Sequence, residues 1–125
     1  MSALTNGKVN PARGANPTGI IFYDATGWMS VNIQGDHPPI ELAGDAPTPE
    51  ESHAALRTYW AYFGTYTLDE QAKTVTHHRT GSVNPGWRRH PDYVRAYEFL
   101  GPDRVVLRPQ APARAGNELV WERLR

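Results

Sequence analysis

The chain of 125 residues contains no cysteine, which excludes disulfides, thiolate catalysis and Cys-ligated zinc. It has no surplus of charge either, because 13 Lys and Arg balance 13 Asp and Glu, so nothing in the composition points to nucleic acid or an anionic membrane as partner. Apolar runs of about 18 residues, which could span a bilayer, are missing. The first fifteen residues lack the apolar centre of a signal peptide. We therefore expect a cytoplasmic protein.

What is present fits one compact domain. The hydrophobic fraction of 39% is enough for one core. The segment through Pro17 is rich in Gly, Pro, Asn and Ala, which predicts a mobile arm or an irregular strap. We place residues 1–15 in this N-terminal arm and residues 16–125 in the folded domain.

Downstream of the arm, the pattern predicts short strands joined by turns. Residues 19–23 are rich in β-branched and aromatic side chains, and residues 28–34 alternate apolar with polar, so the two segments form a hairpin around residues 24–27. Five further strands are expected at residues 63–68, 74–80, 93–100, 104–108 and 118–124.

One helix is expected, beginning at Pro49 and ending near Trp60. Thr48 is placed to cap it, and Glu51 is placed to complete a capping box. Aromatic and leucine side chains recur at helical spacing from Leu56 onward, which predicts that one face of the helix packs against the strands.

Seven short strands and a helix favour an all-β barrel, because curling a sheet into a barrel removes its exposed edges. A β-sandwich is the alternative.

Several segments resemble a known family, the small bacterial and fungal lipocalin-like domains. The similarity covers residues 14–124 and rests on the segments 16–31, 62–67, 75–78, 85–87, 95–107 and 119–123. The resemblance implies an antiparallel up-and-down barrel of about seven to eight short strands with one short helix, and a central cavity for a small molecule. The family's usual first strand, with a Gly-Thr-Trp type motif, has no counterpart here. We therefore expect either a barrel of seven strands or a gap beside the strand at residues 18–23. The arm or a second copy of the chain in a homodimer would fill that gap.

Strand alternation predicts which side chains point into the barrel. Taking the aromatic faces as inside, the interior contains His77, Arg95, Arg123, Tyr66, Tyr97 and Trp121. No Asp or Glu shares those faces. A buried guanidinium is costly without a partner, which could be a backbone carbonyl, a loop carboxylate, water or an anionic ligand. The alternative is that Arg95 and Arg123 extend to the barrel mouth and keep their charged ends in water.

The leading hypothesis is binding of a small apolar or amphipathic anion in the central cavity. Besides the residues above, its expected contacts include Trp87, Trp28, Met29 and Tyr23. The alternative is a cofactor-independent isomerase, cyclase or hydro-lyase of natural-product metabolism. His77 and Tyr66 would then transfer a proton, and Arg95 or Arg123 would stabilise an oxyanion. A third possibility is an accessory or oligomerising protein with a filled core.

Neither a metal nor a cofactor is expected. His77 and His78 are adjacent in a strand and point to opposite faces, so they cannot chelate one ion. An inward His77 could transfer protons near neutral pH. It could equally be a structural histidine, hydrogen-bonded to Tyr66 or to the backbone.

Overall fold

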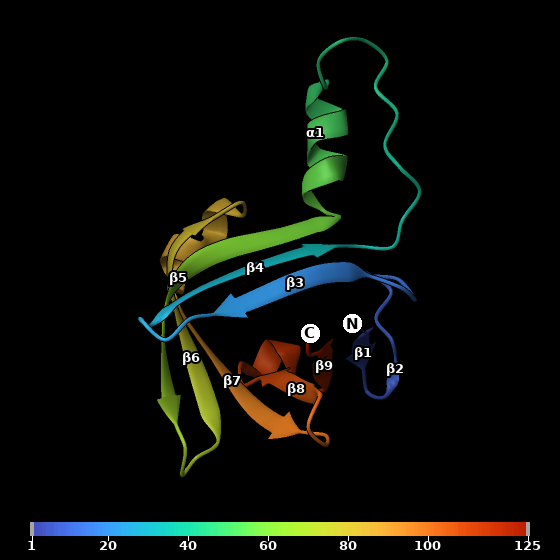
Figure 1. Cartoon of the computed structure of the whole chain (residues 1–125). Coiled ribbons are helices and arrows are strands. Elements are labelled where there is room, and N and C mark those ends of the chain that lie inside the picture. Colours follow the sequence, from blue (N-terminus) through green and yellow to red (C-terminus); the bar gives the residue numbers. More distant parts are fainter. Residues whose placement is uncertain (1, 125) are drawn as a thin grey trace.

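The computed structural model describes residues 2–124, which form one curled sheet with a projecting helix (Figure 1). The strands are β1 (Ser2–Thr5), β2 (Lys8–Val9), β3 (Thr18–Tyr23), β4 (Trp28–Gln34), β5 (Tyr59–Asp69), β6 (Thr74–Ser82), β7 (Asp92–Phe99), β8 (Arg104–Pro109) and β9 (Asn117–Glu122). The helices are α1 (Pro49–Leu56) and the 3-10 turns η1 (Pro85–Arg89) and η2 (Pro112–Arg114).

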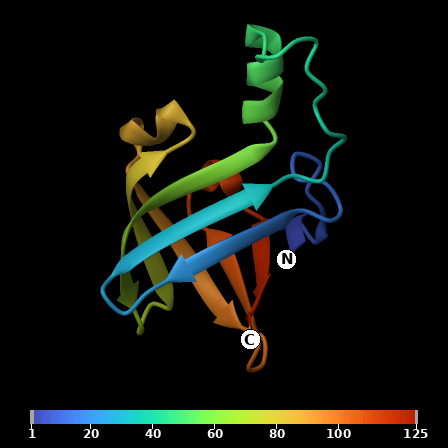
Figure 2. The same ribbon diagram turned by 45° about the horizontal axis from the view of Figure 1, so that its top comes forward.

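All strands belong to a single antiparallel sheet in the order β2-β1-β9-β8-β7-β6-β5-β4-β3. Consecutive strands are neighbours from β3 to β9, and β1 returns to pair with β9, which is an up-and-down arrangement. The sheet curls so that β3 lies across from β1 and β9 (Figures 1 and 2). The predicted all-β, up-and-down antiparallel fold is confirmed. The described residues form nine strands rather than seven or eight.

The N-terminal segment differs from the expectation of an arm with no strand in it. Ser2–Thr5 pairs with β9 in antiparallel register, and β2 follows after a tight turn at Asn6 and Gly7, both with positive φ. Asn-Gly is the sequence typical of such a turn. Ala3 lies opposite Leu119 and is 3% exposed, so this strand belongs to the core. It extends the β9 side of the sheet and leaves the outer edge of β3 unpaired among the described strands.

The start of the helix is confirmed and its end is not. The Thr48 side chain accepts a hydrogen bond from the Glu51 backbone, and the Glu51 carboxylate accepts one from the Thr48 backbone, which completes the capping box. The helix ends at Leu56, and Tyr59 already begins β5. None of its residues is buried, and it stands away from the sheet (Figure 2). The expected packing face was wrong because the aromatic residues that suggested it belong to a strand.

The core lies on the concave side of the sheet. In β4, Met29, Val31 and Ile33 are each 3% exposed, and they alternate with less buried residues. Across the barrel they meet buried side chains of β6, β8 and β9, among them Val75 and Leu107. Alternation along each strand therefore decides which side chains reach the interior.

Candidate functional site

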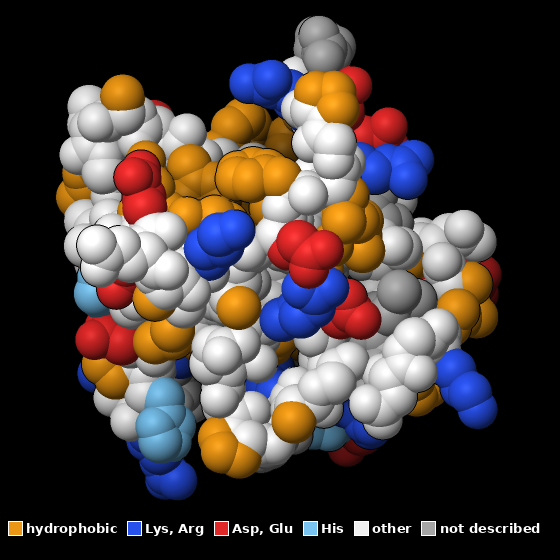
Figure 3. Space-filling model, turned by 90° about the horizontal axis from the view of Figure 1, so that it is seen from below, with side chains coloured by type: hydrophobic (Ala, Val, Ile, Leu, Met, Phe, Trp, Pro, Cys, Tyr) orange, Lys and Arg blue, Asp and Glu red, His pale blue; other side chains and the backbone are white. Residues whose placement is uncertain are grey.

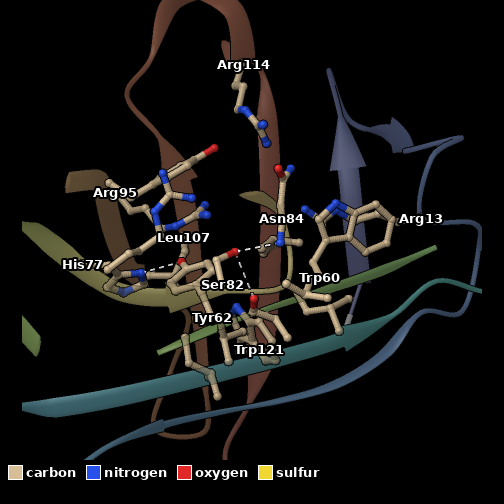
Figure 4. Close-up of a pocket in the computed structure, with 18 residues that line it drawn as sticks. Arg13, Trp60, Tyr62, His77, Ser82, Asn84, Arg95, Leu107, Arg114 and Trp121 are labelled. Atoms are coloured by element: carbon tan, nitrogen blue, oxygen red, sulfur yellow. Dashed lines mark hydrogen bonds between the residues drawn. The ribbon is translucent and has the colours of Figure 1, made fainter. Parts of the chain in front are cut away.

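A pocket of about 80 Å³ opens within the concave side of the sheet. Its apolar lining consists of Ile21, Val31, Ile33, Trp60, Leu107, Leu119 and Trp121, among others. Its charged lining consists of Arg13, Arg79, Arg95 and Arg114. Figure 4 shows Arg95 and His77 on one side, Arg13 and Trp60 on the other, and Arg114 reaching toward the space between them.

The four arginines come from different parts of the chain. Arg79 belongs to β6 and Arg95 to β7, whereas Arg13 precedes β3 and Arg114 ends η2. None of the described lining residues is Asp or Glu. The pocket is therefore cationic, as the strand faces had predicted, although the loop carboxylates considered as partners lie elsewhere.

Aromatic rings hold these guanidinium groups. The Cζ atoms of Arg95, Arg79 and Arg114 lie 4.4, 4.8 and 5.6 Å from the centre of the Tyr93 ring. Arg13 lies 4.2 Å from the centre of the Trp60 ring. Each contact of this kind contributes about 0.5–2 kcal/mol, more where water is excluded. Cation–π contacts thus position the charges without neutralising them.

Hydrogen-bond partners for these groups are few. Arg79 donates to the backbone carbonyls of His90 and Pro91. Arg95 is only 6% exposed, and its guanidinium takes part in none of the ion pairs among residues 2–124. Within residues 2–124, Nη1 of Arg13 and Nε1 of Trp121 are buried without a hydrogen-bond partner. Buried donors normally have an acceptor, so the pocket presents N–H groups that a guest can satisfy.

The positive charges act on one another. Burial lowers the pKa of Arg13 to about 10, with further contributions from Arg95 and Arg114. Burial also lowers the pKa of Arg79. With a pKa of about 10, Arg13 remains protonated at neutral pH. A bound anion would relieve this repulsion, and an uncharged guest would not.

His77 lies beside this cluster and is completely buried. Its Nε2 is 2.6 Å from the Tyr23 hydroxyl, and its Nδ1 is 2.7 Å from the Tyr62 hydroxyl. Burial, followed by the charges of Arg95 and Arg79, lowers the pKa of His77 to about 3. Burial also raises the pKa of Tyr23. A neutral imidazole has one donor and one acceptor nitrogen, so one tyrosine donates to the ring and the other accepts from it.

The predicted pair of His77 and Tyr66 is not formed. The two residues are register partners on β5 and β6, but the Tyr66 hydroxyl donates to the backbone carbonyl of Asp24 at 2.7 Å. The tyrosines that do reach His77 come from β3 and from an earlier position in β5. Curvature of the sheet brings them there, and strand phase alone did not predict it.

Of the other predicted contacts, Arg95 and Trp121 line the pocket, and Arg123 does not. The expectation for Arg123 was wrong because β9 ends at Glu122; Arg123 is exposed, and its backbone N–H bonds to the Asp103 carbonyl. Arg79 lies two residues after His77 in β6 and therefore on the same face of the strand, so alternation could have predicted that it points inward. Arg13 and Arg114 lie in irregular segments, where the sequence carries no signal for direction.

The remaining expected contacts do not line the pocket. Met29 belongs to the core, Trp28 is 48% exposed, and Tyr97 packs edge-on against Phe99. Trp87 lines an adjoining groove. None of these four side chains lines the pocket of 80 Å³.

The architecture and the pocket define the class: a curled, up-and-down antiparallel barrel whose concave side forms a cavity. A family model for the lipocalin-like domain matches residues 2–124, and the chain belongs to that family. No curated protein and no solved structure matches it.

Two further observations concern the rest of the molecule. Within residues 2–124, no helix has both the length and the apolar character needed to cross a bilayer, and no three His, Asp or Glu side chains gather as a metal site requires. On the face seen in Figure 3, basic and acidic side chains are interspersed with apolar ones. That face shows no large patch of a single charge sign.

Proposed function

We propose that the protein binds a small amphipathic anion in the cationic pocket of its barrel. The observation that carries this proposal is the convergence of four arginines on a pocket with no carboxylate among its described lining residues. Burying an uncompensated guanidinium such as Arg95 costs several kcal/mol even after relaxation. A bound anion offsets that cost.

The chemistry of the lining indicates the class of ligand. Guanidinium groups bind carboxylates and related oxyanions through paired N–H donors, and the unpartnered Arg13 and Trp121 donors add to this set. Apolar side chains such as Leu107 and Leu119 line the same space. We infer a carboxylate, enolate, phenolate or similar oxyanion attached to an apolar body.

Binding is favoured over turnover by the state of His77. Both ring nitrogens are already engaged by tyrosines, and a pKa of about 3 makes the imidazole a weak base at neutral pH. The proton-transfer alternative would need a base whose pKa lies closer to the working pH. We therefore propose a binding protein rather than an isomerase, cyclase or hydro-lyase.

Replacing Arg95 with methionine is expected to weaken anion binding by at least ~10-fold, since a charge-assisted hydrogen bond contributes about 1.5–3 kcal/mol. Methionine keeps an unbranched side chain and removes the charge. The probes are 8-anilinonaphthalene-1-sulfonate and N-phenyl-1-naphthylamine, which share their rings and differ in the sulfonate. Fluorescence titration should show tight binding of the sulfonate only.

The matched control is Arg104→Met, at an exposed position at the start of β8. It should bind the sulfonate like the unmodified protein, and circular dichroism should show that both variants are folded. Equal affinity for the two probes, together with an unchanged affinity in Arg95→Met, would refute the proposal. If Arg95→Met does not fold, Arg13→Met provides the same test from an irregular segment.

We also propose a homodimer, which rests on the outer edge of β3, and a cytoplasmic location, which rests on the sequence. The outer edge of β3 has no described partner strand, and such an edge favours pairing with a second chain. Light scattering at micromolar concentration should give twice the mass of one chain. The mass of one chain would contradict the dimer.

A further inference from the structure

A second hollow adjoins the pocket. It is a groove of about 590 Å³, and it shares Arg79, Asn84, Tyr93 and Arg114 with the inner pocket. Because the same four side chains line both, the two spaces meet at these residues. A guest could therefore extend from one space into the other.

The two spaces differ greatly in size. The inner pocket of about 80 Å³ is well below the roughly 300–1,000 Å³ of sites that enclose a whole small molecule. It has room for a compact group such as a carboxylate or a sulfonate. The groove of about 590 Å³ has room for the rest of the ligand.

The charges favour one orientation. The buried guanidinium of Arg95 and the unpartnered donors of Arg13 and Trp121 all belong to the inner pocket. The groove, in contrast, contains the carboxylate of Asp92, which is paired with His78 and repels an anion. Arg79 and Arg114 line both spaces, but only the inner pocket adds Arg13 and Arg95 and has no carboxylate among its described lining residues, so an anionic group is stabilised more strongly inside than in the groove.

The groove offers surfaces for an apolar body. Trp87 from η1, Val94 from β7 and Ala111 next to η2 line it. The η1 turn is held in place by Asn84, whose side chain accepts a hydrogen bond from the backbone of Gly86 at 2.9 Å. The indole of Trp87 thus lies on a braced turn at the wall of the groove.

We infer that the ligand binds head-in: its anionic group enters the inner pocket between Arg13 and Arg95, and its apolar body lies in the outer groove against Trp87 and Val94. This orientation rests on the proposed function and adds an outer subsite to it. The opposite orientation would bury an apolar group beside Arg95 and leave that charge uncompensated. The ligand class is then an oxyanion on a body too large for the barrel interior.

Filling the groove tests the outer subsite. Ala111→Trp adds an indole to the groove wall at a position that does not line the inner pocket, and it should weaken binding of 8-anilinonaphthalene-1-sulfonate by at least ~10-fold. Val94→Trp, on another wall, should act in the same way. The matched control is Ala54→Trp on the exposed helix α1, which should leave the affinity unchanged.

The position of the bound rings decides the orientation. Nuclear Overhauser effects from the probe's ring protons to Val94 methyl and Trp87 indole protons are expected, and effects to the methyls of Ile33 and Leu119 would show the opposite orientation. Unchanged affinity in both groove variants overturns the head-in inference. If Arg95→Met still abolishes binding in that case, the proposed function stands. If Arg95→Met also leaves the affinity unchanged, both the head-in orientation and the proposed function are refuted.

Discussion

Gly64→Ala is expected to lower the free energy of unfolding by ~3 kcal/mol or more. Gly64 is buried in β5 at the point where its register with β6 shifts. A Cβ atom here would lie well inside van der Waals distance of the His78 carbonyl oxygen and close to the backbone of Arg79. Both neighbours are main chain of the paired strand and cannot rotate away, so overpacking must be relieved by displacing strands.

Urea denaturation measures this effect. The matched control is Gly44→Ala, since Gly44 has open space around its Cα and no positive φ. That change should be neutral or slightly stabilising, because alanine reduces the freedom of the unfolded chain. If Gly64→Ala is as stable as the control, the backbones of β5 and β6 do not approach each other closely at Gly64.

His77 should make the stability depend on pH. Its pKa is about 3 when folded, against about 6.5 for an unperturbed histidine, because burial and nearby arginines oppose its charge. The unfolded chain therefore binds more protons between these values, and stability falls as the pH falls. The contribution is fully present above pH 6.5 and is lost progressively toward pH 3, a total of roughly 5 kcal/mol.

His77→Gln removes this titration and retains one donor and one acceptor for the Tyr23 and Tyr62 hydroxyls. The variant should be less stable than the original at pH 7, by about 1–3 kcal/mol, and the difference should shrink as the pH approaches 4. Denaturation series across this range measure it. His53→Gln, on the exposed helix, should keep the original pH profile. Parallel profiles for the original protein and His77→Gln would contradict a neutral, buried imidazole.

Local features were predictable from the sequence. The strand Trp28–Gln34 and the capped start at Pro49 are both observed as expected, because alternation and capping depend on neighbours a few residues away. The end of the helix was wrong. Tyr59 and Trp60 fit a helical spacing as well as a strand, and pairing with β4 decides for the strand. Tertiary pairing overrides local propensity in such ambiguous segments.

The site was predictable in part, because alternation along a strand depends only on neighbouring residues. His77, Arg95 and Trp121 lie on strands, so strand phase was enough to place them inside. The arginines from irregular segments, Arg13 and Arg114, carry no periodic signal, and only the assembled barrel brings them to the pocket.

From the sequence by itself, period-two alternation predicted the strands and placed His77 and Arg95 on inward faces, because alternation records which face of each strand is buried, and the resemblance to the lipocalin-like family implied the up-and-down antiparallel barrel. Only the tertiary structure shows that residues 2–5 form a strand, which tyrosines bond to His77, and that four arginines converge on one pocket. These depend on the curvature of the sheet and on contacts between segments far apart in the chain. Such contacts have no local pattern in the sequence.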